Sequence, residues 1–451
     1  MRVLLHGAYR GFAGGARDVT LDAATLREAL EALVRAHPSL AERMRDEHGR
    51  LRAHLSLFVN QEDARFLGGE DATLADGDIV HVLPALSGGE TQEGDAMTKQ
   101  VLLLVGTKKG LYTLRSDADR RKWTVDGPRE APAPIHHASY DPRDGSMYAA
   151  INSTWGGSRI QYSRDLGKTW QTSKNPAFPE GSDRTFFQTW HIEPGHAKTP
   201  NVLWAGTEPA ALWKSEDRGE TWQLNQALDD QPSRAKWVPG FGGMGLHSIA
   251  IDASDPKRMQ VGISVGGVYT STDGGASWVQ DNAQTGGKED RPDVFYCIHK
   301  LLAHPAVSGV RFMRVHVDVF WREPGETAWR NRTEGLPSTF GFAAAMHPRD
   351  RSVAYVIPLD DTKRTASPPG IGVYSTNDRG ATWTRNDKGL PPGAALESVR
   401  EGMDTDLLDP LGVYFGTANG DVWASRDEGK SWEPAARYLP YVTSVHAATI
   451  D

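Results

Sequence analysis

The sequence predicts a mainly β fold in which a small α+β domain precedes a seven-bladed β-propeller. The first observation is an eight-residue phrase, Ser/Thr-x-Asp-x-Gly-x-Ser/Thr-Trp, which occurs at residues 163–170, 215–222, 271–278, 376–383 and 425–432. The second is that Trp123 and Trp329 extend the series of phrase-ending Trp residues to seven, spaced 47 to 56 residues apart. A period of about fifty residues per four-stranded unit is typical of propeller blades. The third is that residues 1–89 lack the phrase and show a different order of elements.

Each copy of the phrase lies between two short β-type runs and therefore predicts the turn of a hairpin. In such a turn the Asp carboxylate accepts backbone N–H groups, the Gly takes a positive φ, and the Trp packs the turn against its strands. The phrase resembles the Asp-box of bacterial neuraminidase repeats (BNR), which lie on propeller blades. This resemblance implies that the boxes lie at the blade periphery, so we expect them to stabilise turns rather than to carry chemistry.

Residues 1–89 predict a second, smaller fold. Short β-type runs at residues 3–5 and 18–20 precede a capping box, Thr25 to Glu28, and a helix with an apolar stripe at Leu26, Leu30 and Leu33. Two alternating strands follow at residues 55–59 and 79–83. This ββαββ order is the one that a ubiquitin-like β-grasp domain requires.

Several phrases in this region resemble the MoaD/ThiS sulfur-carrier family, which includes the small subunit of molybdopterin synthase and the thiamine-pathway carrier. They stand at residues 58–60, 63–67, 74–78 and 83–89, the last ending in Gly88 and Gly89. The resemblance implies a flexible Gly-Gly tail that enters an E1-like activating enzyme, is adenylated there and becomes a thiocarboxylate. Gly89 is joined to Glu90, so this chemistry needs cleavage after Gly89. Otherwise the domain is a retained fold that acts by binding.

The remaining boundaries follow from composition and from the repeats. Residues 90–99 are polar and without periodicity, which predicts a flexible linker. Residues 100–451 form the predicted propeller, but its first blade has three β-type runs and no inner strand before them. Residues 442–450 repeat the inner-strand phrase at the other end. We therefore predict that they complete the first blade and close the ring, leaving no free sheet edge.

Candidate site residues emerge when the inner strands are aligned on the Asp-Pro or His-Pro that closes them. The aligned positions, which should converge towards the propeller axis, hold His136, Gln188, His247, His299 and His446, with Phe342 and Val399 in the other two blades. Neutral imidazoles bind Zn, Cu, Fe and Ni, so His136, His247, His299 and His446 are candidate ligands of a metal ion on the axis. The alternative is that these rings satisfy nearby backbone groups. Connections near the same face add further candidates for ligand binding: His191, Arg234, Lys236, Arg400 and Glu401.

Charge and cysteine content narrow the class of function. The net charge of −8 and the dispersed Lys and Arg residues argue against a nucleic-acid partner or an anionic membrane surface. Cys297 is the single cysteine, which excludes an intramolecular disulfide. With no signal-peptide pattern and no long apolar run, the sequence predicts a cytoplasmic protein.

Three functions remain open. The first is a binding scaffold for a small molecule, glycan or protein, tethered to a sulfur-carrier-like domain. The second is a sialidase-like glycosidase acting at the His-rich face, although the Arg-Ile-Pro motif is absent and no spacing supports Glu208 and Glu401 as its paired carboxylates. The seven-bladed count resembles photosystem-assembly-factor-like proteins more than six-bladed sialidases. The third is a sulfur carrier for molybdopterin or a related product, released by cleavage at Gly89.

Overall fold

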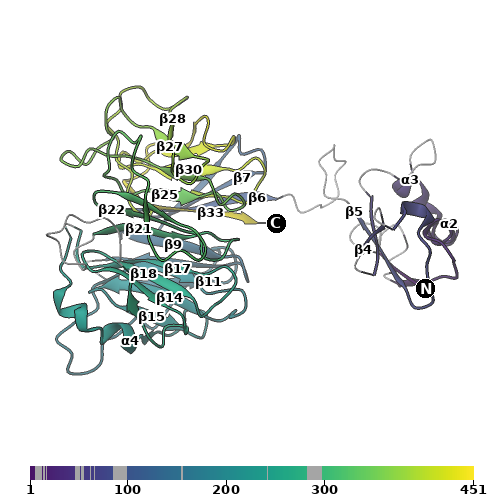
Figure 1. The fold of residues 1–451 in the computed structure, drawn as a ribbon, viewed down its shortest axis with the longest axis horizontal. Coiled ribbons are helices and arrows are strands. Elements are labelled where there is room, and N and C mark those ends of the chain that lie inside the picture. The colour runs from purple at the N-terminus through teal and green to yellow at the C-terminus, as the bar shows by residue number, and fades with distance from the viewer. Residues whose placement is uncertain are drawn as a thin grey trace. The chain divides into compact units, whose positions relative to one another are not determined.

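The chain folds into two compact units, Met1–Asp95 and Ala96–Asp451. The computed structural model, drawn in Figure 1, describes residues 1–5, 13, 16, 18–45, 51, 55–60, 62–64, 67–84, 99–153, 156–240, 242–281 and 297–450. The predicted Gly88–Gly89 tail and all of the predicted linker except residue 99 lie outside these residues. Among the described helices, none combines the length and the apolar character that a membrane span needs.

The N-terminal unit is the predicted β-grasp fold. Its sheet has the order β2-β1-β5-β3-β4, with β1 and β5 parallel. The strands are β1 (Arg2–Leu5), β2 (Asp18–Thr20), β3 (Leu55–Val59), β4 (Glu62–Asp63) and β5 (Ile79–Pro84). Helix α2 (Leu26–Ala36) packs Leu26, Leu30 and Leu33 into one core with apolar residues of β1, β3 and β5. Short helical turns complete the unit: η1 (Pro38–Leu40), α3 (Ala41–Met44) and η3 (Gly69–Asp71).

The capping box at the start of α2 forms as predicted. Thr25 Oγ1 accepts the N–H of Glu28 at 3.3 Å, and the Glu28 carboxylate accepts the N–H of Ala24 at 2.8 Å. The first bond satisfies a backbone donor that the first turn of a helix leaves without a partner, and the second ties the Glu28 side chain to the residue before the N-cap. The sequence therefore sets where α2 begins and which of its faces meets the sheet.

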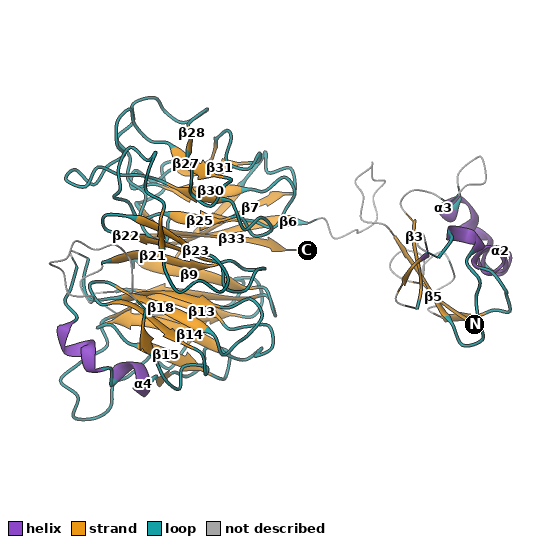
Figure 2. Ribbon diagram, viewed as in Figure 1, coloured by secondary structure: helices purple, strands orange, loops and turns teal. Residues whose placement is uncertain are grey.

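The second unit is a propeller whose described residues form seven four-stranded antiparallel sheets, seen as strands in Figure 2. From inner to outer strand, blade 1 is β33 (Val442–Ile450), β6 (Gln100–Thr107), β7 (Gly110–Asp117), β8 (Thr124–Arg129); blade 2 is β9 (Ile135–Asp141), β10 (Ser146–Ile151), β11 (Arg159–Ser163), β12 (Gln171–Thr172); blade 3 is β13 (Gln188–Pro194), β14 (Leu203–Glu208), β15 (Leu212–Ser215), β16 (Gln223–Leu224). Blade 4 is β17 (Leu246–Ile251), β18 (Met259–Ile263), β19 (Gly267–Ser271), β20 (Val279–Gln280); blade 5 is β21 (Ile298–Ala303), β22 (Arg311–Val315), β23 (Val319–Arg322), β24 (Arg330–Asn331). Blade 6 is β25 (Ala344–Met346), β26 (Ala354–Val356), β27 (Val373–Thr376), β28 (Thr384–Asn386), and blade 7 is β29 (Met403–Thr405), β30 (Val413–Gly416), β31 (Val422–Ser425), β32 (Glu433–Ala436). Between blades 3 and 4 the chain forms α4 (Gln226–Asp229) and η4 (Pro232–Lys236).

Blade 1 is closed by the C-terminal strand. β33 pairs antiparallel with β6 from Val442 opposite Thr107 to Ile450 opposite Gln100. The Thr443 hydroxyl also donates to the carbonyl of Ile135 in blade 2. The strand therefore supplies the inner edge that the first blade lacks and joins it to the next blade.

The Asp-boxes have the predicted turn geometry and an additional role between blades. Asp165 accepts the N–H of Thr169 at 2.8 Å and its hydroxyl at 2.6 Å, while Gly167 takes a φ of +87°. In the next box, Trp222 donates from Nε1 to Ser173 Oγ at 2.9 Å, and that hydroxyl donates to the carbonyl of Gly219 at 2.6 Å. Ser173 directly follows the outer strand of blade 2, so the box of blade 3 is also bonded to its neighbour.

In the described residues, five inner strands contain a β-bulge near their start, and these bulges position the site. The residues inserted by the bulges are His136, Trp190, His247, His299 and Thr443. A bulge places two residues of one strand opposite a single residue of its partner and so changes the direction of the side chains. The five residues are therefore structurally equivalent, although their types differ.

We predict that Asp427→Ala lowers the free energy of unfolding by about 1–3 kcal/mol, because it removes the acceptor of several turn hydrogen bonds. Asp427 accepts the N–H of Ser431 at 2.8 Å, the hydroxyl of Ser431 at 2.6 Å and that of Ser425 at 2.7 Å. Chemical denaturation measures the change. Asp119→Ala is the control, since that exposed carboxylate forms no hydrogen bond or ion pair with another described residue. Equal stability of the two variants would contradict the structural role of the box.

Candidate functional site

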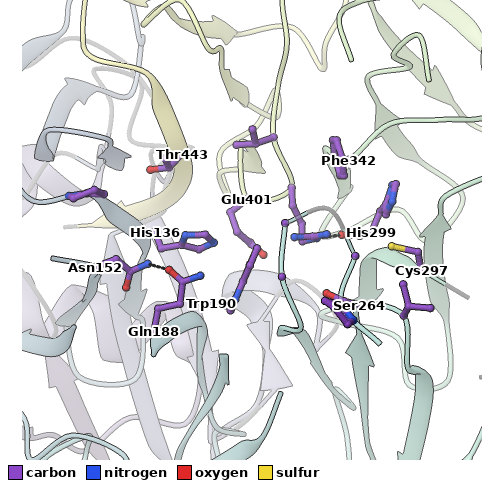
Figure 3. A pocket seen from close by; sticks show the side chains of 18 of the residues that line it. His136, Asn152, Gln188, Trp190, Ser264, Cys297, His299, Phe342, Glu401 and Thr443 are labelled. Atoms are coloured by element: carbon purple, nitrogen blue, oxygen red, sulfur yellow. Dashed lines mark hydrogen bonds between the residues drawn. The ribbon is translucent and has the colours of Figure 1, made fainter. Parts of the chain in front are cut away.

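A cavity of about 1660 Å³ opens on the face where the inner strands begin. All seven blades contribute to its lining in the described residues; from blades 1 to 7, examples are Lys108, His136, Trp190, Ser264, His299, Phe342 and Arg400. Figure 3 shows several of these side chains around the space. Binding sites commonly form at such concave faces, where many chain segments converge on one volume.

Trp190 is held in the cavity wall by a chain of polar contacts. Its Nε1 donates to Glu208 Oε2 at 3.0 Å, and Gln188 Nε2 donates to the same oxygen at 2.7 Å. Asn152 Nδ2 in turn donates to Gln188 Oε1 at 2.7 Å, a bond drawn in Figure 3. Gly243 covers Glu208 so closely that a Cβ there would lie 2.2 Å from Oε1. This network fixes the Trp190 ring and occupies the Glu208 carboxylate.

Arg400 brings a positive charge to the cavity. Its Nε donates to the carbonyl of His299 at 2.6 Å. Its guanidinium carbon lies 5.3 Å from the centre of the Trp190 ring and 5.6 Å from that of Phe342, within the range of cation–π attraction. Burial lowers the pKa of Arg400 below its ordinary value. Among the described residues it has no carboxylate partner within ion-pair distance.

Beneath this wall, Glu401 joins inner strands of several blades. Its Oε2 lies 2.6 Å from Lys300 Nζ and 3.7 Å from His137 Nε2, and its Oε1 lies 3.5 Å from His191 Nδ1. His191 Nε2 also bonds Glu193 at 2.9 Å. Burial opposes ionisation of Glu401, yet Lys300 and His191 hold its pKa well below the ordinary value. Blades 2, 3, 5 and 7 therefore meet at one carboxylate.

The two histidines of this cluster differ in charge. Burial and the neighbouring His191 lower the pKa of His137 well below 6.5. His137 Nδ1 accepts the N–H of Ile192 at 3.2 Å, so the proton of the neutral ring is on Nε2, towards Glu401. Burial also acts against protonation of His191, but the carboxylates of Glu401 and Glu193 raise its pKa to about 9. The cluster thus pairs a charged His191 and Lys300 with two carboxylates.

The structure brings together five of the ten residues predicted for ligand binding. His136, Gln188, His299, Arg400 and Glu401 line the cavity. His191 does not line it but contacts Glu401 below its floor. Arg234 and Lys236 lie outside the lining. Arg234 instead pairs with Asp229 at 3.1 Å and donates to the carbonyl of Ala210, and Lys236 is exposed on η4.

The predicted four-histidine metal site does not form. Among the described residues, no three of His136, His247, His299 and His446 bring their ring nitrogens within 4.8 Å of one another. His247 is fully buried, with Nδ1 3.2 Å from Ser248 Oγ, and His446 pairs with Asp404 at 3.2 Å farther along β33. The bulges explain the position of His446: in blades 1 and 3 the positions equivalent to His136, His247 and His299 are occupied by Thr443 and Trp190, not by His446 and Gln188. The strand-closing Asp or His does not keep a constant distance from the bulge.

Two other groups have the composition of metal ligands. One group is His137, His191 and Glu401. The other is Cys297, His299 and His316. In each group the potential ligand atoms lie within 4.8 Å of one another.

The sequence predicted only some members of these groups as site residues: His191 and Glu401 of the first group and His299 of the second. His137 and Lys300 each directly follow a predicted histidine. An alignment of the inner strands that allowed for the bulge would have identified them. His316 lies in a hairpin with no motif around it, and no sequence pattern distinguishes it.

We predict that His191 gives the protein an alkaline loss of stability. Its folded pKa of about 9 exceeds the ordinary 6.5, so the folded state keeps a proton that the unfolded state releases. The stabilisation is complete below pH 6.5 and is lost as the pH rises through about 9. Denaturation across this window should show the loss in the wild type and not in His191→Gln. In His136→Gln the alkaline loss should persist, because burial lowers the pKa of His136 to about 4; alkaline behaviour shared by all three proteins would contradict the assignment.

Comparison with known proteins identifies the N-terminal unit. Residues 3–89 match the ThiS family. The sulfur carrier protein CysO of Mycobacterium tuberculosis is 37% identical over 82 residues, which make up 18% of this chain and 88% of CysO. The resemblance predicted from the Gly-Gly phrase and its neighbours is therefore confirmed over almost the whole length of a curated carrier.

The propeller has more distant relatives. Residues 161–172 match the BNR/Asp-box repeat. The probable oligoxyloglucan-reducing end-specific xyloglucanase of Neosartorya fischeri is 26% identical over 267 residues, 51% of this chain but only 31% of that protein. The solved GH74 xyloglucanase of Xanthomonas campestris superposes with a TM-score of 0.54 at 18% identity, over 77% of this chain and 52% of that one, which shows a shared fold. Through residues 3–89 the chain belongs to the ThiS family, and it joins that sulfur-carrier-like domain to a BNR-repeat propeller.

Proposed function

We propose that the propeller is a binding scaffold whose cavity holds a ligand through a carboxylate group. The observation that carries this proposal is Arg400, whose charge lies between two aromatic rings in the cavity without a carboxylate partner among the described residues. A guanidinium presents paired donors that match the two oxygens of a carboxylate. Trp190 and Phe342 fix its position and offer apolar surface to the rest of the ligand.

The volume of the cavity favours an extended ligand. At about 1660 Å³ it exceeds the roughly 300–1,000 Å³ of typical small-molecule pockets. Phe187 and Val317 line it and are 61% and 41% exposed, so apolar surface continues to the cavity mouth. A chain end, such as the C-terminal segment of a peptide, combines this length with a terminal carboxylate.

A glycosidase is the second candidate, favoured by the similarity to xyloglucanases and opposed by the surroundings of the two predicted carboxylates, Glu401 and Glu208. A general acid needs a carboxyl group with a raised pKa, placed opposite a second carboxylate. Lys300 and His191 hold the pKa of Glu401 well below its ordinary value. Glu208 accepts bonds from Gln188 and Trp190 and does not line the cavity. Neither residue is suited to protonate a leaving group.

The N-terminal domain acts, in this proposal, as a binding module for a protein partner of the kind that recognises sulfur carriers, such as an E1-like activating enzyme. Its match to the ThiS family ends at Gly89, and the chain continues through Glu90. Transfer of sulfur, for molybdopterin or another product, would require a free carboxylate at Gly89. The polar residues that follow contain no recognisable cleavage motif.

We predict that Arg400→Gln weakens binding of carboxylate ligands by about 10- to 100-fold, the loss expected for a charge-assisted hydrogen bond. Affinity selection from matched tetrapeptide libraries, with free or amidated C-termini, measures the preference. Wild-type protein should retain the free acids; Arg400→Gln should retain neither form well. Lys236→Gln, which removes an exposed charge outside the cavity, should bind as the wild type does. Equal retention of both libraries, or cleavage of xyloglucan oligosaccharides, would overturn the proposal.

We also predict that the chain stays intact in an extract of host cells supplied with ATP and cysteine. Intact-mass measurement should give the full-length mass, because the residues after Gly89 contain no recognisable cleavage motif. A fragment ending at Gly89, with sulfur in place of one oxygen, would instead establish the carrier reaction. Insertion of a protease site after Gly89 provides the control, since the released domain has the tail that activation requires.

A further inference from the structure

Cys297, His299 and His316 lie together on the part of the cavity wall formed by blade 5. Their potential ligand atoms are within 4.8 Å of one another, and all three residues line the cavity. Figure 3 shows Cys297 beside His299. Cys297 precedes β21 by one residue, and its carbonyl accepts the N–H of His316 at 3.0 Å. Backbone pairing between the first two strands of the blade therefore holds the three residues together.

Each imidazole has one ring nitrogen close to an oxygen: the Gly341 carbonyl for His299 and the Asp361 carboxylate for His316. His299 Nδ1 lies 2.7 Å from the carbonyl of Gly341, which can only accept, so this nitrogen carries the proton and Nε2 has the lone pair. The His299 ring is stacked on Phe342 with centroids 4.5 Å apart. His316 Nε2 lies 3.2 Å from Asp361 Oδ1. Carbonyl and carboxylate partners of this kind orient histidines that bind metals.

We propose that Cys297, His299 and His316 bind a zinc ion whose fourth coordination position opens into the cavity. One thiolate and two imidazoles suit zinc, and three protein ligands with an open position characterise zinc sites that bind an exogenous group. A filled tetrahedral site separates sulfur and nitrogen ligands by about 3.5 Å. The potential ligand atoms of the blade 5 group lie within 4.8 Å of one another, and Cys297 releases its thiol proton to solvent when it binds the metal.

The other potential group, His137, His191 and Glu401, is unsuitable for a cation. Glu401 already bonds Lys300 Nζ at 2.6 Å, and the carboxylates beside His191 raise the pKa of that ring to about 9. A metal there would have to displace an ammonium and a proton inside a buried cluster. The blade 5 group contains no lysine.

The zinc site extends the binding function without depending on it. Arg400 donates from Nε to the carbonyl of His299, so its charge lies beside the proposed ion. Zinc with one thiolate retains a single positive charge. A carboxylate ligand could then contact both the metal and the guanidinium, but metal binding itself is measured with no organic ligand.

The test uses the reduced full-length protein, purified without chelator, loaded with Zn²⁺ or Co²⁺ and separated from excess metal. We expect stoichiometric metal by elemental analysis and, with Co²⁺, the charge-transfer absorption of a thiolate ligand. Cys297→Ser should lose that absorption, His316→Gln should lose stoichiometric binding, and Asp361→Asn should weaken affinity by about 10-fold. His446→Gln is the matched control, because this histidine also pairs with a carboxylate but lies outside the cavity lining.

The outcomes separate this site from its alternatives. Stoichiometric cobalt with a thiolate band that only the blade 5 variants remove supports the proposal. Absence of bound metal overturns it, as does binding that Cys297→Ser and His316→Gln leave unchanged. Loss of binding in His191→Gln but not in Cys297→Ser would overturn it too, by assigning the metal to the Glu401 cluster. Retention of free-acid peptides by the metal-free protein would leave the carboxylate function intact.

Discussion

The interior of the propeller depends on the contacts that the Glu401 carboxylate makes with residues of other blades. The carboxylate bonds Lys300 of blade 5 at 2.6 Å and approaches His137 of blade 2 and His191 of blade 3. Backbone pairing holds strands within a blade, whereas this cluster holds blades to one another across the axis. Burying these groups costs the desolvation of several charges, which their mutual attraction opposes. Arg400, the next residue before it, is thereby held at the cavity wall, so the binding surface rests on a neutralised interior.

The periphery of the propeller could be predicted because its determinants are local. Asp165 accepts two hydrogen bonds from Thr169 within a single turn in which Gly167 takes a positive φ, and Asp, Gly and Ser or Thr recur at these positions in the other boxes. The capping box of Thr25 and Glu28 is local in the same sense. Closure by β33 also followed from sequence, since a blade lacking an inner strand leaves only one chain segment of the right pattern to complete it.

The interior was predicted less well because its determinants are long-range. His299 and Arg400 were found, but their bond joins residues 101 positions apart. Lys300 and His137 were missed because the bulges redirect the chain immediately before them. Sequence patterns for strands assume that successive side chains point to opposite faces of the sheet. A bulge interrupts this alternation, so the pattern no longer predicts which way the following residues point. His446 and Gln188 were misaligned for the same reason, and Cys297 with His316 became a group only through backbone pairing in blade 5.

The closing strand also imposes an order of events during synthesis. Thr443 bonds Ile135 across 308 positions of sequence, so the ring cannot close until almost all of the propeller has left the ribosome. Until then β6 presents an open edge, which is the kind of surface that pairs with other chains. The N-terminal domain faces no such delay, because its five strands lie within the first 84 residues. A nascent chain therefore carries a folded carrier-like domain ahead of an unclosed ring, and contacts of such high sequence separation form slowly.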